Sequence, residues 1–198
     1  MNDYFSKLQQ NHYKVVLADP PWTFVVRSPK GETKSPQAHY QCMGIESIKA
    51  MPVVNLAHPE GAVCVMWATA PMIQEALDTM KSWGWTYKSM AAWAKQSSTG
   101  TKWAFGTGYI FRSAAEFILV GTRGKIQQKA RNVRNLLVSP VREHSRKPDL
   151  IYDLVESLWD GPYVELFSRA HRQGWDSFGD QVGKFEETVS NGMFSFAK

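Results

Sequence analysis

Residues 14–22 have the sequence Lys14-Val15-Val16-Leu17-Ala18-Asp19-Pro20-Pro21-Trp22. The four apolar residues at 15–18, two of them β-branched, predict a short strand that is buried on both faces. Pro20 and Pro21 have no N–H group and cannot continue a strand ladder, so we expect the strand to end at Asp19. The stretch therefore predicts a carboxylate, two prolines and an indole at the C-terminal edge of a parallel sheet. In open α/β folds, ligands bind at that edge.

These groups suit the methylation of an exocyclic amine on a base, whose nitrogen is a poor nucleophile because its lone pair is delocalised into the ring. The Asp19 carboxylate and the Pro20 carbonyl can each accept one N–H and hold the nitrogen for attack. Trp22 can stack on the base, an interaction worth roughly 1–3 kcal/mol. The alternative is a Pro-Pro turn after a core strand, with Trp22 as a packing residue.

Further blocks follow this stretch in a fixed order. They are Val65-Met66-Trp67, Thr107-Gly108, Lys147-Pro148-Asp149-Leu150-Ile151-Tyr152, Glu165-Leu166-Phe167-Ser168-Arg169-Ala170-His171 and Gly179-Asp180-Gln181, with Tyr40 and Glu116 between them. Together with Asp19-Pro20-Pro21-Trp22, they resemble the MT-A70 family of S-adenosylmethionine-dependent N6-adenine methyltransferases. The resemblance implies an α/β, Rossmann-like methyltransferase sheet with helices on both faces. It also implies a permuted order, in which the catalytic motif precedes the cofactor motif.

The same resemblance implies the residues of the site. The catalytic residues would be Asp19, Pro20, Pro21 and Trp22, and the methyl group would pass directly from S-adenosyl-L-methionine, with no covalent enzyme intermediate and no metal. The cofactor-binding residues would be Asp19, Lys147, Glu165, Phe167, Arg169, His171, Asp180 and Gln181. The sequence has no G-x-G-x-x-G fingerprint, so the cofactor follows from the resemblance alone. Ser168 and Arg172 depart from the family's usual glycine and asparagine.

Nucleic acid is the partner expected from charge and aromatic content. Between Gly121 and Pro148 there are eight basic residues and one acid, whereas the rest of the chain has slightly more acids than bases. We expect this basic segment to lie beside the site. Its basic residues either contact phosphates or belong to a solvated loop. Residues 96–112 combine glycines and aromatics with Lys102 and Arg112, which suits an unstacked nucleotide or half-buried packing. The candidate substrate residues are Tyr40, Lys95, Trp103, Arg123, Lys125, Lys129, Arg131 and Arg134.

The chain has 198 residues, of which 43% are hydrophobic, and predicts a single domain over 1–198 with its core at about 14–183. It contains no run of 18 apolar residues and no basic-then-apolar leader, so neither a membrane span nor a signal peptide is expected. Cys42 and Cys64 offer neither a disulfide framework nor a metal-ligand spacing. A reducing, cytoplasmic setting is expected.

The remaining elements follow from hydrophobic spacing and from glycine and proline. Strands are predicted at 62–68, 87–95, 115–121 and 163–167, the last of them closing the sheet. Helices are predicted at 45–51, between Pro71 and Gly84, and from Pro148 onward.

We therefore expect an enzyme that methylates N6 of adenine in nucleic acid. DNA is favoured over RNA because the sequence contains no zinc finger or appended recognition domain. The alternatives are an RNA N6-adenosine methyltransferase, an enzyme acting on a glutamine side chain or a small-molecule amine, and a non-catalytic nucleic-acid-binding subunit. Relatives that act on glutamine commonly carry Asn and Tyr in the motif, so Asp19 and Trp22 favour adenine. Monomer, homodimer and heterodimer all remain open.

Overall fold

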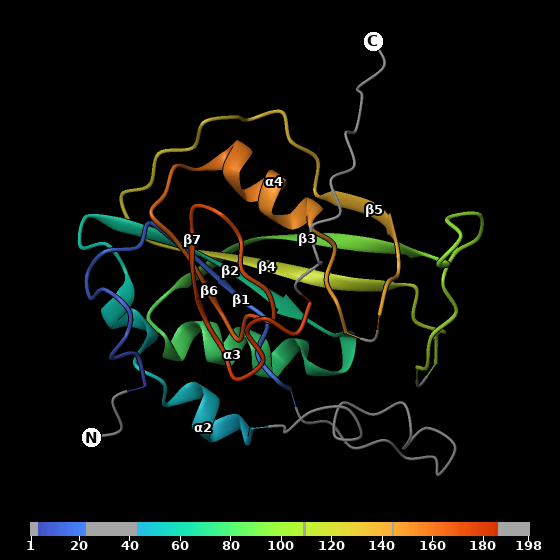
Figure 1. Cartoon of the computed structure of the whole chain (residues 1–198), viewed down its shortest axis with the longest axis horizontal. Coiled ribbons are helices and arrows are strands. Elements are labelled where there is room, and N and C mark those ends of the chain that lie inside the picture. The colour runs from blue at the N-terminus through green and yellow to red at the C-terminus, as the bar shows by residue number, and fades with distance from the viewer. Residues whose placement is uncertain (1–3, 23–42, 109, 144, 186–198) are drawn as a thin grey trace.

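The computed structural model describes residues 4–22, 43–108, 110–143 and 145–185, and these form a seven-stranded mixed sheet with helices (Figure 1). The strands are β1 (Val15–Ala18), β2 (Gly61–Ala68), β3 (Thr86–Gln96), β4 (Ala115–Gly124), β5 (Leu136–Pro140), β6 (Tyr163–Leu166) and β7 (Trp175–Phe178). The helices are α2 (Ile45–Lys49), α3 (Ile73–Ser82) and α4 (Leu150–Leu158), with 3-10 turns η2 (Val53–Leu56) and η3 (Ala70–Met72). The strand order is β5-β3-β4-β2-β1-β6-β7.

β1 occupies the interior of this sheet, and all four of its residues are buried. It pairs in parallel with β2 and β6, with Ala18 opposite both Met66 and Leu166. A strand flanked on both edges and covered on both faces needs apolar side chains throughout, as this one has. The predicted strand and its end before Asp19 are confirmed.

β4 runs against its neighbours. It pairs antiparallel with β2 and β3, with Ala68 opposite Phe117 and Gly61 opposite Gly124. The other six strands share one direction. Their C-terminal ends and the start of β4 therefore lie together at one end of the sheet, which we call the Asp19 end. The opposite end is called the far end.

Each face of the sheet has its own apolar core. On one face, Ile48 of α2, Leu56 of η2 and Met80 of α3 pack against the strands. On the other face, Ile151 and Val155 of α4 pack against the opposite side of β1 and β2. Figure 1 shows α4 above the sheet and α2 and α3 below it. The predicted α/β sheet with helices on both faces is confirmed.

Three strands differ from the sequence expectation, and one of them is β5, which was not predicted as a strand. The fourth strand continues to Gly124, whose backbone has φ +60° and approaches Glu60 so closely that a Cβ would lie 2.3 Å from the Glu60 carbonyl oxygen. The sheet does not close at residues 163–167, because β7 adds a further strand beside β6. β7 is only four residues long and half polar, so its sequence carries little strand signal. Among the helices that the structure describes, none is long and apolar enough to cross a membrane.

Candidate active site

The turn that follows β1 is fixed by main-chain hydrogen bonds. The Asp19 N–H donates to the Leu166 carbonyl (3.3 Å), which ties the end of β1 to the end of β6. The Trp22 N–H donates to the Pro20 carbonyl at 2.8 Å. A carbonyl oxygen has two lone pairs, so the Pro20 carbonyl keeps one for a further donor.

Trp22 is buried in the core on the α3 side of the sheet, with 4% of its surface exposed. Its indole Nε1 donates to the Trp67 carbonyl of β2 at 3.1 Å. These contacts anchor the turn against β2. The predicted stacking of Trp22 on a base stays a prediction, and Tyr40 lies outside the described residues.

Four charged side chains meet at the Asp19 end of the sheet, and we call them the acid–lysine cluster. Lys147 Nζ donates to Asp19 Oδ2 at 2.8 Å and lies 3.3 Å from Glu116 Oε2. Lys95 Nζ donates to Glu116 Oε1. Their side chains are only 14–19% exposed. The charges thus alternate in sign along this series of contacts, from Asp19 through Lys147 and Glu116 to Lys95.

The two lysines of the cluster favour the ionised form of Glu116. Burial by itself raises the pKa of Glu116, but the ammonium groups of Lys147 and Lys95 outweigh it and lower that pKa to about 2. The two ammonium groups also lie over indole rings. Lys147 Nζ is 5.5 Å from the ring centre of Trp67, and Lys95 Nζ is 4.8 Å from that of Trp93. The cluster therefore holds Lys147 on Asp19 in a fixed place.

A third carboxyl group, that of Glu165, lies on β6 opposite Leu17 of β1. Tyr152 of α4 donates its hydroxyl to Glu165 Oε2 at 2.9 Å, and Ser168 donates to the same oxygen at 2.7 Å. Burial raises the pKa of Glu165 to about 7, although these two hydrogen bonds favour the ionised form. Near neutral pH this side chain is therefore divided between its protonated and ionised forms.

Glu165 makes the stability of the fold depend on pH. Because its pKa is raised from 4.5 to about 7 on folding, the folded chain binds a proton that the unfolded chain has lost between these values. Its contribution to stability is full at low pH and is lost as the pH rises toward 7, a change of about 3 kcal/mol. We expect Glu165→Gln to remove this slope, as measured by urea unfolding at pH 5 and pH 7.5. An identical pH dependence in the two proteins would contradict the raised pKa.

The ends of β6 and β7 form a backbone cradle beside the cluster. The Ser168 N–H donates to the Phe178 carbonyl at 3.0 Å, and Phe167 adopts φ +62° as the chain leaves β6. A Cβ on Gly179 would lie 2.4 Å from the Ser168 carbonyl oxygen, so only glycine allows this approach. The structure thus brings Glu165 and Phe167 close to the segment that carries Asp180 and Gln181.

The predicted residues Arg169 and His171 belong to the loop between β6 and β7. The Arg169 carbonyl accepts the Phe185 N–H at 3.2 Å, which ties this loop to residues 181–185. Arg172, the departure from the family pattern, is bound to α4 through Glu156 (3.0 Å) and Asp153 (2.9 Å). Arg172 therefore fastens the loop to α4.

The long β3–β4 connection begins and ends in the acid–lysine cluster, since Lys95 precedes it and Glu116 follows it. Trp103 forms an isolated bridge with Gln96 but remains 64% exposed. Phe105 is 77% exposed, and the guanidinium of Arg112 lies 4.7 Å from its ring centre. Exposed aromatics next to cations are thus placed beside the site.

The basic segment does not lie where it was expected. β4 is antiparallel, so its C-terminal residues Arg123 and Gly124 lie at the far end, opposite the start of β2. Arg123 donates to the Val54 carbonyl at 3.3 Å, and Lys125 bonds through its N–H to Glu60. Lys129 pairs with Asp160 (2.9 Å), just beyond the C-terminal end of α4. The expectation that the chain after Gly121 runs beside the site is wrong for these residues, and their contact with nucleic acid stays a prediction.

Sequence reasoning did not assign a role to Glu116, Tyr152 or Ser168. Glu116 was named only as part of the resemblance, although an acid directly before the apolar run 117–120 of β4 is unusual enough to mark a paired site. Tyr152 and Ser168 gave no such signal, because a helical tyrosine and a loop serine are common.

Comparison with known proteins identifies a family and several relatives. The MT-A70 family model matches residues 13–181. The chain is 27% identical over 201 residues to the type II methyltransferase M.MunI of a Mycoplasma species, covering 92% of this chain and 83% of that protein. It is 29% identical to the Drosophila N(6)-adenosine-methyltransferase MT-A70-like protein, over 86% of this chain and 27% of that one. It is 25% identical to the human N(6)-adenosine-methyltransferase catalytic subunit METTL3, over 94% of this chain and 33% of that one.

This chain thus spans most of M.MunI but only about a quarter to a third of the plant and animal relatives. The family match covers β1 to β7 and all four residues of the acid–lysine cluster. The chain belongs to the MT-A70 family of methyltransferases, whose methyl donor is S-adenosylmethionine.

Proposed function

We propose that this protein methylates N6 of adenine in nucleic acid, with DNA favoured over RNA. The observation that carries the proposal is the Asp19 carboxylate, fixed by Lys147 at the end of β1 with Glu116 and Lys95 behind it. Support for DNA comes from coverage, because the chain spans 83% of a type II methyltransferase and far less of each N(6)-adenosine-methyltransferase.

In the proposed reaction, the residues of the turn after β1 orient the amine. Asp19 accepts one N–H of the amine, and the free lone pair of the Pro20 carbonyl accepts the other. A carboxylate at this position can also receive the proton that the nitrogen releases as it is methylated. Orientation of this kind supplies much of the rate enhancement in a direct transfer. Lys147 keeps Asp19 from turning away, because their hydrogen bond is 2.8 Å long and largely buried.

The residues around the cluster fit S-adenosylmethionine, which supplies an electrophilic methyl group when bound. The Lys147 ammonium offers a partner for its carboxylate, and the Asp180 and Gln181 side chains offer acceptors and a donor for a nucleoside. The tight approach of Gly179 to Ser168 places those polar residues at the Asp19 end of the sheet. Phe167, Arg169 and His171 are proposed to complete the binding site.

The test is direct. The protein is incubated with S-adenosylmethionine and either DNA or RNA oligonucleotides, and the nucleosides are analysed by mass spectrometry. N6-methyladenine in DNA alone is the expected result. Methylation of RNA alone would overturn the preference for DNA. Binding of nucleic acid without any methyl transfer would identify the chain as a non-catalytic subunit.

The β3–β4 connection gives a prediction about salt. If Lys102 and Arg112 contact phosphates, nucleic-acid affinity falls with salt, and reversing both to Glu should reduce the log–log slope by about 1–2. Anisotropy titrations over a range of salt concentrations measure this slope. The matched control is Lys7→Glu with Lys81→Glu, which reverses two exposed charges elsewhere.

The same titrations test the basic segment. Reversing Lys125 and Arg131 should change the slope less than reversing Lys102 and Arg112, because Lys125 follows β4 at the far end of the sheet. A larger effect from Lys125 and Arg131 would move the binding surface to the far end.

A further inference from the structure

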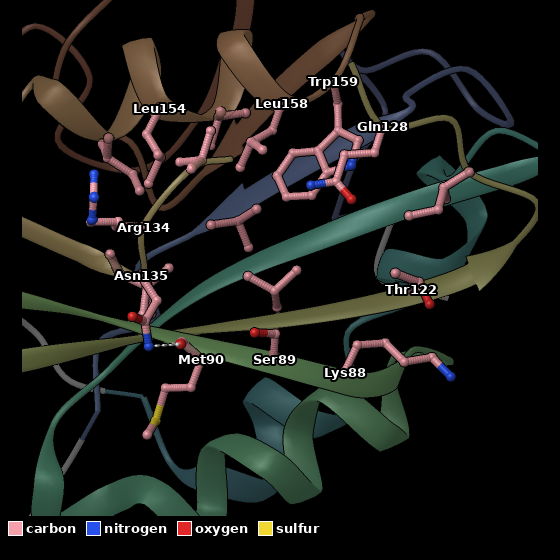
Figure 2. A pocket seen from close by; sticks show the side chains of 18 residues that line it. Lys88, Ser89, Met90, Thr122, Gln128, Arg134, Asn135, Leu154, Leu158 and Trp159 are labelled. Atoms are coloured by element: carbon pink, nitrogen blue, oxygen red, sulfur yellow. Dashed lines mark hydrogen bonds between the residues drawn. The ribbon is translucent and has the colours of Figure 1, made fainter. Parts of the chain in front are cut away.

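A pocket of about 430 Å³ lies between α4 and the strands on the α4 side of the sheet (Figure 2). Leu154 and Leu158 of α4 form one wall, and Val120 of β4 lies on the wall opposite. Residues 126–135, which connect β4 to β5, complete the lining. Pockets of about 300–1,000 Å³ with mostly apolar walls are typical of small-molecule sites.

The pocket is separate from the candidate active site. None of the four members of the acid–lysine cluster lines it. Its lining includes Lys88 and Thr122, which belong to the part of the sheet near the far end, where Thr122 pairs with Thr86 at the start of β3. A molecule bound here would therefore leave the Asp19 end of the sheet accessible.

The charge around this pocket has a single sign. Its lining includes Lys88 and Arg134 but no aspartate or glutamate. Lys88 is the extra residue of a β-bulge between Tyr87 and Ser89, and Figure 2 shows it on a different side of the pocket from Arg134. Neither cation forms an ion pair with a described residue. An apolar cavity is thus bordered by two cations that have no acidic partner within the described part of the chain.

The polar side chain of Asn135 in the pocket lining is already engaged by the protein itself. Asn135 uses its side-chain amide to donate to the Met90 carbonyl at 3.2 Å, which holds the covering segment against β3. The indole Nε1 of Trp159 is buried and has no acceptor among the described residues, so it is out of a ligand's reach and the walls that face the pocket are mainly apolar.

We propose that this pocket binds a small organic anion, with an apolar body between α4 and the sheet and an acidic group paired with one of the two cations at its border, Lys88 or Arg134. Burial of the body against the leucines and valines supplies the affinity, at roughly 25 cal/mol per Å² of apolar surface. A charge-assisted hydrogen bond from either cation selects an acid over a neutral molecule of the same shape. This site is independent of the proposed methyl transfer.

The probe is 8-anilinonaphthalene-1-sulfonate, an aromatic anion whose fluorescence rises in apolar surroundings. Titrated into the full chain, it should bind at a single saturable site, and the neutral N-phenyl-1-naphthylamine should bind at least about tenfold more weakly. Equal affinity for the two probes, or no saturable binding, would overturn the proposal.

Two sets of variants locate the probe. Lys88→Glu with Arg134→Glu should weaken its binding by about tenfold or more, whereas the control pair Lys7→Glu with Lys81→Glu should not. Ser89→Trp places a large side chain on the exposed pocket wall and should abolish binding, whereas Tyr87→Trp on the same strand should not. Circular dichroism and thermal midpoints check that all four proteins fold. Unchanged binding in the Lys88/Arg134 and Ser89 variants would contradict the site.

Competition identifies the body of the ligand. Displacement by decanoate indicates an aliphatic acid, and displacement by naphthoate indicates an aromatic one. If neither acid displaces the probe, the proposed ligand class is wrong. If an oligonucleotide displaces it and both acids fail, Lys88 and Arg134 belong to a nucleic-acid surface instead.

Discussion

Replacing Asp19 by alanine is expected to reduce the rate of methyl transfer by ~10²–10³-fold, because one oriented acceptor for the reacting amine is lost. The fold should survive, since Asp19 follows β1 and Lys147 keeps its second partner, Glu116, at 3.3 Å. Single-turnover methyl transfer, measured together with the thermal midpoint, tests both statements.

Two comparisons sharpen this test. Asp19→Asn retains one acceptor oxygen and should therefore fall between the wild type and Asp19→Ala. Asp78→Ala removes a carboxylate from α3, where Asp78 accepts a hydrogen bond from Gln74, and should leave the rate unchanged. Activity of Asp19→Ala within tenfold of wild type would rule out the assigned role.

Replacing Lys147 by alanine is expected to weaken S-adenosylmethionine binding by more than tenfold, while nucleic-acid binding changes little. The ammonium group of Lys147 is the only described contact that joins Asp19 to Glu116. Its loss removes the proposed partner of the cofactor carboxylate and leaves Asp19 without its 2.8 Å hydrogen bond. Calorimetry with the cofactor and anisotropy with an oligonucleotide measure the two affinities separately.

The same substitution has a consequence for stability. Without Lys147, one of the two cations that lower the pKa of Glu116 is gone, so that pKa should rise. Removing a charged hydrogen-bond partner at a largely buried position costs about 1–3 kcal/mol. Lys147→Arg should recover part of the stability. Equal losses of cofactor and nucleic-acid affinity would place Lys147 on the nucleic-acid surface.

Several features of the chain could be predicted because they depend on local sequence. The apolar run at 15–18 and the two prolines after it determine a buried strand that stops at Asp19, whatever its neighbours are. The strands at 62–68 and 87–95 and the helix after Pro71 follow from the same local patterns and are found as β2, β3 and α3. The order of short motifs was likewise enough to identify the family.

Strand direction was beyond local sequence. The run at 115–124 has the same apolar composition in a parallel or an antiparallel strand, yet its direction decides which end of the sheet each residue occupies. Because β4 is antiparallel, Glu116 lies at the Asp19 end and Arg123 at the far end. The sequence expectation placed the basic segment wrongly for this reason.

The sequence therefore determined β1, its stop and the family, since burial and proline geometry act within a few residues. Only the tertiary structure decided that Lys147 meets Asp19 across 128 positions of chain, and that Glu116 lies between Lys147 and Lys95. It also decided that Glu165 is buried, which raises its pKa to about 7. The physical reason is that charge pairing and desolvation depend on distances across the sheet, which pairing between distant strands sets.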